Sequence, residues 1–208
     1  MNQKNSLGLN SCFLDLKDPI ELFKIWMDEA KTTELNDPNA LALATADINA
    51  KPSVRMVLLK DFSKSGFIFY TNLESQKSNE LKENPKASMC FYWKSLLRQV
   101  RVNGIISKVN EDLADEYYNS RSYDSRIGAW ASKQSRVLKN RKDLILSIEE
   151  YKKKYNKRDD VPRPKHWSGW NLLPSSIEFW LDGDNRIHER LKYSLDKSGS
   201  WTKSLLSP

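Results

Sequence analysis

Hydrophobic side chains recur along the chain at two spacings, and each spacing predicts a different element. Strands are predicted where short apolar or alternating runs occur, at residues 40–45, 53–59, 66–71, 87–93, 98–109, 172–181, 186–194 and 201–206. Helices are predicted where the pattern has helical period, at residues 19–27, 75–84, 111–118, 124–131 and 135–155. With strands first, helices in the middle and strands last, the order predicts a mainly β fold with flanking helices (α+β), built around an antiparallel barrel.

The last predicted hairpin carries a concentration of basic side chains. Its first strand includes residues 177–181, and its turn is the Gly- and Asn-containing segment 182–185. In the strand that follows, Arg186, His188 and Arg190 would point to one face, because alternate residues of a strand share a face. Neighbouring cations repel one another unless an anionic or electron-rich group faces them, so this stripe indicates a binding site. A solvated edge strand, kept charged to block aggregation, explains it equally well.

Length and composition describe a single folded domain. The chain has 208 residues, of which 39% are hydrophobic and 29% charged, a balance typical of globular proteins. No apolar run reaches the roughly 20 residues needed to span a bilayer, and the N-terminus lacks the apolar core of a signal peptide. Cys12 and Cys90 show no metal or redox spacing. We therefore expect a flexible N-terminal segment over 1–17, one domain over 18–208, a cytoplasmic location and no membrane partner.

The net charge of +7 is compatible with nucleic acid, an anionic membrane or phosphorylated ligands. Basic residues are spread along the chain, with one concentrated patch at residues 152–154 and 157–158 that is typical of a solvated helix end or loop. Nucleic-acid binding is suggested by the charge alone, so we expect no nucleic-acid partner.

Clusters of hydroxyl groups with a cation occur at places far apart in the sequence. One, at residues 75–78, opens a predicted helix, and helix N-termini attract anions. A second spans residues 117–121 with Ser125, and a third spans residues 130–135. Each cluster alone is equally well explained by ordinary helix caps. Together they predict two phosphate-sized sites in a chain that has no Gly-rich phosphate loop.

Longer motifs run through the chain in a fixed order. They are Arg55-Met-Val-Leu-Leu-Lys60-Asp61, Gly66-Phe-Ile-Phe-Tyr-Thr-Asn72, Arg98-Gln99-Val100, Ser120-Arg121 with Asp124-Ser125, Ile127-Gly-Ala-Trp-Ala-Ser-Lys-Gln-Ser135, and Ile177-Glu-Phe-Trp180 with Arg186-Ile-His188-Glu-Arg190. In this order they resemble the pyridoxamine 5′-phosphate oxidase family over residues 18–208. The resemblance implies an FMN-binding split β-barrel and a homodimer with FMN at the subunit interface.

The resemblance also implies roles for individual residues. The implied FMN-binding residues are Arg55, Met56, Val57, Leu58, Leu59, Lys60, Tyr70, Thr71, Gln76, Lys77, Gln99, Gln134, Ser135, Trp180 and Arg190. The implied substrate-binding residues are Lys60, Tyr117, Arg121, Ser125, Arg186, Ile187 and His188. Arg186 and His188 are also the implied catalytic residues, and no metal ligand is implied.

The activity implied by the resemblance is the oxidation of pyridoxamine 5′-phosphate and pyridoxine 5′-phosphate to pyridoxal 5′-phosphate. FMN takes a hydride from the substrate, O2 is the final acceptor, and H2O2 is the product. Two phosphate esters, one on the cofactor and one on the substrate, would account for the separate hydroxyl-plus-cation clusters. The alternatives are another split-barrel flavoprotein oxidoreductase and a non-enzymatic carrier of pyridoxal phosphate.

The chain departs from the family's pattern at two places. Residues 1–17 contain neither the arginine nor the tyrosine with which close relatives cover the substrate. Gln76 replaces an arginine often found beside the lysine that holds the flavin phosphate, so we expect weaker FMN retention.

Overall fold

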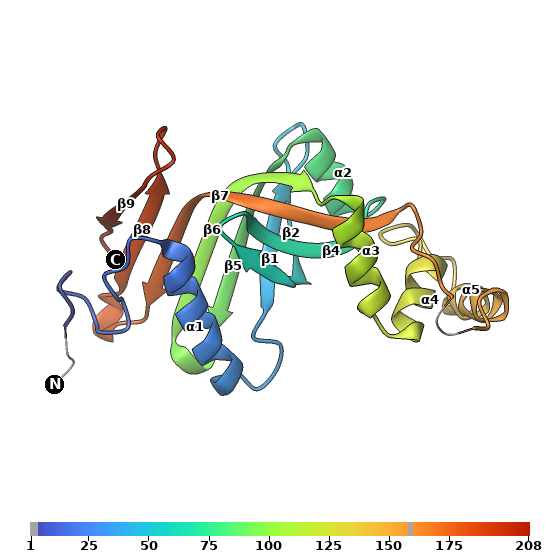
Figure 1. The fold of residues 1–208 in the computed structure, drawn as a ribbon, viewed down its shortest axis with the longest axis horizontal. Helices are drawn as coiled ribbons and strands as arrows, with labels where there is room; N and C mark the ends of the chain where they lie inside the picture. Colours follow the sequence, from blue (N-terminus) through green and yellow to red (C-terminus); the bar gives the residue numbers. More distant parts are fainter. Residues whose placement is uncertain (1–3, 158–159) are drawn as a thin grey trace.

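The computed structural model describes residues 4–157 and 160–208 as one antiparallel sheet with helices at both ends (Figure 1). The strands are β1 (Ala40–Ala46), β2 (Pro52–Leu58), β3 (Asp61–Ser63), β4 (Gly66–Asn72), β5 (Lys86–Trp93), β6 (Arg98–Lys108), β7 (Trp167–Leu181), β8 (Glu189–Leu195) and β9 (Trp201–Leu205). The helices are α1 (Pro19–Thr33), α2 (Gln76–Glu83), α3 (Glu111–Ser120), α4 (Tyr123–Ala131) and α5 (Arg141–Lys154). Residues 1–3 of the predicted N-terminal segment and Arg158 of the basic patch lie outside the described residues. The predicted mainly β fold with flanking helices is confirmed.

The sheet curls into a barrel that is split rather than closed. Its strand order is β2-β1-β5-β6-β7-β4-β3, and β8 pairs with β7 and with β9. After β2 the chain meets β4, where the backbone N–H of Lys60 donates to the carbonyl of Ile68 at 2.8 Å. The curl brings the side chains of β2 and β4 towards one groove.

Strand β7 runs across the whole molecule and joins its two ends (Figure 1). Its first residues pair with β4, and its last residues pair with β8, while β6 accompanies most of its length. The pairing shifts register between Asn103 and Gly104. A Cβ atom at Gly104 would lie 2.1 Å from the carbonyl oxygen of Leu173, so only glycine allows this close approach.

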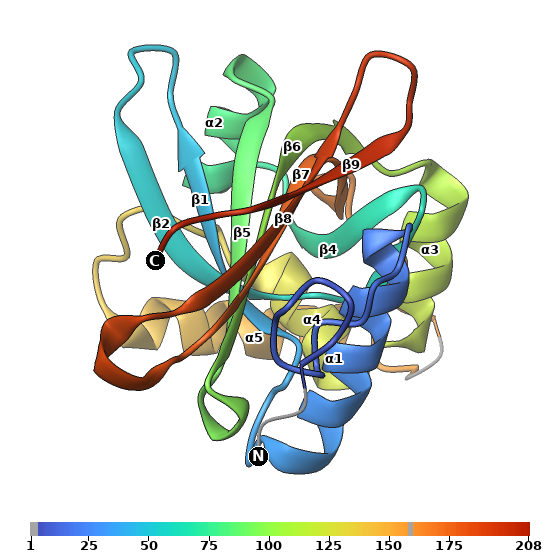
Figure 2. The same cartoon turned by 90° about the vertical axis from the view of Figure 1, so that its left-hand side faces the viewer.

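Helix α1 packs its apolar face into the barrel interior, at the end that also carries β8 and β9 (Figure 2). It begins as the Asp18-Pro19 pair favours, because the Asp18 side chain accepts a hydrogen bond from the backbone N–H of Ile20. The Phe23 ring contacts Phe91 edge to face with centroids 5.1 Å apart, and Trp26 is fully buried. Burial of these aromatic side chains makes α1 a part of the core.

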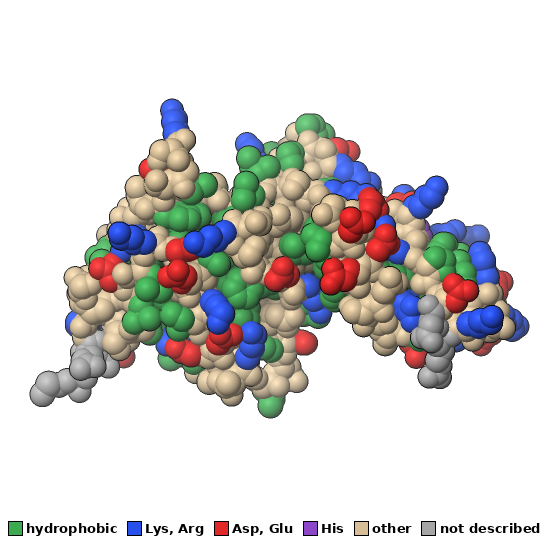
Figure 3. Space-filling model, in the orientation of Figure 1, with side chains coloured by type: hydrophobic (Ala, Val, Ile, Leu, Met, Phe, Trp, Pro, Cys, Tyr) green, Lys and Arg blue, Asp and Glu red, His purple; other side chains and the backbone are tan. Residues whose placement is uncertain are grey.

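Helices α3, α4 and α5 follow one another at the opposite end of the molecule (Figure 1). The helix predicted over 135–155 begins only at Arg141, because Asn140 caps it by accepting from the backbone N–H of Asp143. The basic residues 152–154 fill the last turn of α5. On the face shown in Figure 3, acidic side chains gather over α3 and basic ones over α5, so the charge forms no single basic stripe there.

The turn of the last hairpin differs from the prediction. Strand β8 begins at Glu189 rather than Arg186, because residues 184–186 form a 3-10 turn. Asn185 and Arg186 have φ angles of 53° and 66°, in the left-handed region that ends regular extended structure. Arg186, His188 and Arg190 therefore do not form a stripe on one strand face.

The N-terminal segment also differs from the flexible one expected over 1–17, because its described part packs against the domain. Phe13 is fully buried in the core, and the backbone carbonyl of Cys12 accepts from the indole N–H of Trp26 at 3.0 Å. The backbone N–H of Asn10 donates to a Glu189 carboxylate oxygen at 2.6 Å. In the described part of the chain, no helix is long and apolar enough to cross a membrane.

Candidate functional site

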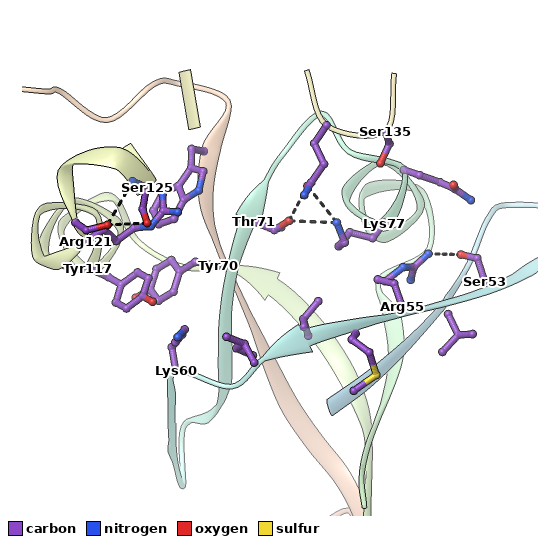
Figure 4. A pocket seen from close by; sticks show the side chains of 18 residues that line it. Ser53, Arg55, Lys60, Tyr70, Thr71, Lys77, Tyr117, Arg121, Ser125 and Ser135 are labelled. Atoms are coloured by element: carbon purple, nitrogen blue, oxygen red, sulfur yellow. Dashed lines mark hydrogen bonds between the residues drawn. The ribbon is translucent and has the colours of Figure 1, made fainter. Parts of the chain in front are cut away.

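A groove of about 820 Å³ lies between β2, β4, α2 and the helices α3 and α4 (Figure 4). Its lining is Ser53, Val54, Arg55, Met56, Val57, Leu58, Lys60, Tyr70, Thr71, Gln76, Lys77, Tyr117, Arg121, Ser122, Ser125, Gln134, Ser135 and Trp167. The hydroxyl-plus-cation clusters that lie far apart in the sequence thus meet in one groove. Leu59 does not reach it: the side chain is 4% exposed, and its backbone N–H and carbonyl both bond to Asn39.

The buried ammonium group of Lys77 marks one end of the groove. Lys77 lies in the first turn of α2, and its Nζ atom contacts Thr71 Oγ1 at 3.3 Å and Gln134 Oε1 at 3.2 Å. Burial lowers the pKa of Lys77, and the nearby positive charge of Arg55 lowers it further. Because its hydrogen-bond partners among the described residues are neutral oxygens, this charge lacks a counterion. The end of the groove is therefore suited to an anion.

The guanidinium of Arg55 enters the same end from β2. Its Nη1 atom donates to Thr45 Oγ1 and to the Leu43 carbonyl, and its Nη2 atom donates to Ser53 Oγ and to Glu80 Oε2. Burial alone would raise the pKa of Glu80, but hydrogen bonds from Ser53, Thr45 and Gln76, together with the Arg55 charge, lower it to about 2. Glu80 is therefore ionised at neutral pH, and Arg55 is held in place before any ligand binds.

Aromatic rings and a second unpaired cation form the other end of the groove. The Tyr70 and Tyr117 rings stack with centroids 4.0 Å apart, and Trp167 lies parallel to Tyr70 at 5.5 Å. The Arg121 guanidinium lies 4.7 Å from the Trp167 ring centre. Burial lowers the pKa of Arg121. Its Nη1 atom is buried without a hydrogen-bond partner among the described residues, which is costly unless a ligand supplies an acceptor.

Lys60 and Ser125 complete this end of the groove. Lys60 Nζ lies 5.9 Å from the Tyr117 ring centre, and Ser125 Oγ accepts from Ser122 Oγ at 2.8 Å. Two cations, Lys60 and Arg121, and two hydroxyls, Ser122 and Ser125, thus line this end of the groove. This arrangement can hold a second anionic group beside a flat aromatic surface.

The predicted catalytic residues lie elsewhere, in the β7–β8 turn, where His188 but not Arg186 lines a hollow of about 520 Å³. His188 lies against Trp180 with ring centroids 4.6 Å apart, and its Nδ1 atom lies 3.0 Å from Asp182 Oδ1. Arg186 and Ile187 are exposed in the turn. These side chains are open to a ligand or to another chain.

The remaining predicted flavin contacts accompany this turn. Gln99 on β6 pairs with Trp180 on β7, which in turn pairs with Arg190 on β8. The Arg190 Nε and Nη2 atoms bond to Glu178 Oε1 at 2.9 and 2.8 Å. Gln99, Trp180 and Arg190 thus form one row across three neighbouring strands.

The groove and the β7–β8 turn lie far apart within one chain. Trp167, in the groove, begins β7, and Trp180, beside His188, stands near its end. At about 3.3 Å per residue, the contour of the strand between them is roughly 40 Å. A ligand as small as one flavin with one pyridine cannot bridge that distance.

Several groove residues were not predicted from the sequence. Ser122 lies between Arg121 and Ser125, so the hydroxyl pattern could have indicated it. Trp167 gives no local signal, since only the pairing of β7 with β4 brings it beside Tyr70. His166, interpreted as a packing or loop histidine, bonds to the Ala129 carbonyl at 2.9 Å and is not part of the groove lining.

Comparison with known proteins agrees with this fold. A family model described as pyridoxamine 5′-phosphate oxidase matches residues 27–155. A second, described as the pyridoxine 5′-phosphate oxidase C-terminal dimerisation region, matches residues 167–208. A pyridoxine/pyridoxamine 5′-phosphate oxidase from Pelagibacter ubique is 74% identical over 208 residues, which is 100% of both chains. One from Allorhizobium ampelinum is 51% identical over 197 residues, covering 94% of this chain and 95% of the relative.

Two solved structures share the fold. PhzG from Burkholderia lata 383, in complex with tetrahydrophenazine-1-carboxylic acid, has a TM-score of 0.89 at 30% identity, covering 96% of this chain and 97% of that chain. A pyridoxamine 5′-phosphate oxidase-related, FMN-binding protein from Nostoc punctiforme has a TM-score of 0.74 at 16% identity, covering 94% and 100%. The fold is thus the split barrel of flavin-binding proteins. The chain belongs to the pyridoxine/pyridoxamine 5′-phosphate oxidase family and is an oxidoreductase.

Proposed function

We propose that the protein oxidises pyridoxamine 5′-phosphate and pyridoxine 5′-phosphate to pyridoxal 5′-phosphate, with FMN as cofactor, O2 as acceptor and H2O2 as product. The observation that carries the proposal is a single groove with a buried cation at each end, Lys77 hydrogen-bonded only to neutral oxygens and Arg121 with its Nη1 atom unsatisfied among the described residues. A substrate and a cofactor that each carry one phosphate would satisfy both. The stacked rings at the Arg121 end suit a flat ring system.

The FMN phosphate would bind at the Lys77 end. Lys77 and Arg55 supply the positive charge, while Gln76, Gln134 and Ser135 line the same region and supply neutral hydrogen-bonding groups. The β2 residues from Met56 to Leu58, with Lys60, Tyr70 and Thr71, would form the wall along the flavin. When bound, FMN supplies the hydride acceptor and the reaction with O2. The protein residues bind and orient the two ligands.

The substrate phosphate would bind at the other end, on Lys60, Tyr117, Arg121 and Ser125. Arg121 Nη1 would gain the acceptor that it lacks in the protein alone. The Tyr117 ring stacks on Tyr70 and cannot rotate freely, so the phosphate position is fixed relative to the groove wall. Fixing the phosphate sets the distance from the pyridine ring to the flavin.

We further propose that a second copy of the chain completes each site. Apolar side chains on β2, where it lines the groove, and on β5 are strongly exposed, with Val54 at 68%, Met56 at 65% and Tyr92 at 56%. Such a patch beside a binding groove is typical of a subunit interface. In a homodimer, the partner's turn would bring Arg186, Ile187 and His188 to the substrate and Gln99, Trp180 and Arg190 to the flavin.

In this arrangement Arg186 and His188 are the catalytic residues. Arg186 would orient the pyridine ring and stabilise negative charge that develops on it, and His188 would assist at the same ring. The backbone N–H of Gly183 donates to His188 Nδ1 at 3.3 Å, and the Asp182 carboxylate lies 3.0 Å from the same atom, so the turn itself holds the imidazole in place. The left-handed backbone at Arg186 projects this residue out of the sheet, where a partner chain can meet it.

The first test is to purify the protein and measure its visible spectrum and its O2-dependent formation of pyridoxal 5′-phosphate and H2O2. We expect a flavin spectrum and stoichiometric peroxide. Unphosphorylated pyridoxamine is the matched control, because it lacks the group that Arg121 would bind. Bound pyridoxal phosphate without peroxide would support a carrier instead, and equal turnover of both substrates would contradict the proposed phosphate site.

The shared site has a separate test. Arg121→Leu and Arg186→Leu damage different half-sites, so each homodimer is expected to have little activity. A mixed dimer contains one chain of each variant, and one of its two sites combines an intact groove with an intact turn. When the two variants are dissociated, mixed and allowed to reassociate, activity should therefore recover. Activity that stays at the level of the separate variants would contradict the shared site while leaving the reaction itself untouched.

A further inference from the structure

The carboxylate of Glu80 is the centre of a buried network behind the cofactor end of the groove. Its Oε2 atom accepts hydrogen bonds from Ser53 Oγ at 2.6 Å, from Thr45 Oγ1 and from Arg55 Nη2 at 3.2 Å. Its Oε1 atom accepts from Gln76 Nε2 at 2.9 Å. One side chain on α2 thereby ties together β1, β2 and the start of α2.

This network engages the guanidinium of Arg55 on one side only. Arg55 has five N–H groups, and four hydrogen bonds join its two Nη atoms to Leu43, Thr45, Ser53 and Glu80. The N–H on Nε has no partner among the described residues. Since Arg55 lines the groove, this N–H and the positive charge remain for a ligand.

The position of Glu80 shows that it does not compete with an anion for Arg55. Glu80 is 6% exposed, and it lines a neighbouring hollow of about 380 Å³ rather than the groove itself. It contacts the guanidinium through Nη2, and the Nε N–H has no partner among the described residues. A carboxylate placed there restrains the arginine from behind instead of occupying the phosphate position.

We propose that Glu80 is a positioning residue for the cofactor phosphate, acting through Arg55. The proposal rests on the function proposed above, in which FMN places its phosphate at this end. A free arginine side chain loses rotamer entropy when a ligand orders it, and the network orders Arg55 in advance. The Ser53 and Thr45 hydroxyls donate to Glu80, so their lone pairs face the Arg55 N–H groups.

The test compares FMN with riboflavin, which has the same ring system without the phosphate. Both dissociation constants are measured by quenching of flavin fluorescence. Glu80→Ala is expected to weaken FMN binding about tenfold, the effect of one charge-assisted hydrogen bond, and to change riboflavin binding less than about twofold. Glu80→Gln retains one carbonyl acceptor and is expected to recover part of the loss.

Two controls isolate the route through Arg55. Glu83→Gln removes the same charge from an exposed side chain on the same helix and is expected to leave both constants unchanged. In an Arg55→Ala background, adding Glu80→Ala is expected to cause no further loss of FMN affinity, because the residue through which Glu80 acts is absent.

Three results decide between the ideas. If Glu80→Ala weakened the binding of FMN and of riboflavin equally, the role of Glu80 would be structural only, and the proposal would be overturned. Tighter FMN binding would overturn it too, since Glu80 would then act as a competing counterion. A wild-type protein that binds FMN no better than riboflavin would instead contradict the proposed phosphate site, whatever Glu80 does.

Discussion

Replacing Lys77 by methionine should make the cofactor-free protein more stable and its binding of FMN weaker. The ammonium group is buried, with the residue 8% exposed, and its contacts with Thr71, Ser75 and Gln134 are long, at 3.2–3.3 Å, and to neutral oxygens. Because burial lowers the pKa of Lys77 below 10.5, the folded protein holds this proton less tightly than the unfolded chain. Protonated Lys77 therefore destabilises the fold throughout the neutral range.

The effect of Lys77→Met on the free energy of unfolding and its effect on FMN binding have opposite signs and similar sizes. Methionine has nearly the same volume, and replacing buried charge by an apolar side chain of that volume stabilises by roughly 1 kcal/mol or more. For a chain of this length, 1 kcal/mol raises Tm by about 2–4 °C. Loss of one charge-assisted hydrogen bond to phosphate, worth about 1.5–3 kcal/mol, weakens FMN binding about tenfold to a hundredfold.

The assay is thermal unfolding of the flavin-free protein together with a flavin titration. Lys86→Met is the control, since Lys86 is exposed at the start of β5, outside the groove lining. The stability gain should vanish above pH 10.5, where the unfolded lysine also loses its proton. A lower Tm for Lys77→Met together with unchanged FMN affinity would refute the reasoning that this charge is held for a ligand.

Three further predictions address other parts of the groove. Arg121→Leu should raise KM for pyridoxamine 5′-phosphate about tenfold or more while flavin titration shows unchanged FMN affinity; a normal KM would exclude Arg121 from the phosphate site. Gln76→Arg should tighten FMN binding by about fivefold, because it adds a charge at the start of α2, and calorimetry giving the same Kd would count against this. The pKa of Glu80 is lowered from 4.5 to about 2, so its ionised form stabilises the fold above pH 4.5 and this contribution is lost as pH falls towards 2. Urea unfolding should show that the difference in free energy of unfolding between wild type and Glu80→Gln shrinks over that interval. A difference that does not change with pH would contradict the lowered pKa of Glu80.

Local sequence signals predicted most of the elements, because their causes are local. The Asp18-Pro19 pair marks the start of α1, and alternating apolar residues mark most of the strands. The start of β8 was wrong because a period-two pattern does not reveal where a turn ends. Positive φ angles at Asn185 and Arg186 extend the turn, and nothing in residue type announces them. Strand β3 was missed because three residues are too few to show a period.

The groove was predicted by family motifs rather than by local rules. The structure brings Arg55, Lys77 and Arg121 into one lining, although they lie on different elements, and their ligand contacts stay predictions. Leu59 follows the last residue of β2 and is buried, so its side chain does not line the groove. Glu80 belongs to none of the motifs, so its contacts could not be predicted from the sequence. Its hydrogen bonds to Thr45 and Ser53 form only when α2 packs against β1 and β2.

Strand β7 has a consequence for how damage spreads through the proposed dimer. One continuous strand carries Trp167 at the groove and Trp180 at the distant turn. In the dimer these two tryptophans serve different active sites. A lesion confined to one half-site would disable one site of a mixed dimer, whereas a lesion that shifts the register of β7 would disable both. A mixed dimer of one chain with a defective β7 and one wild-type chain would therefore have no active site, which is how a dominant-negative allele acts.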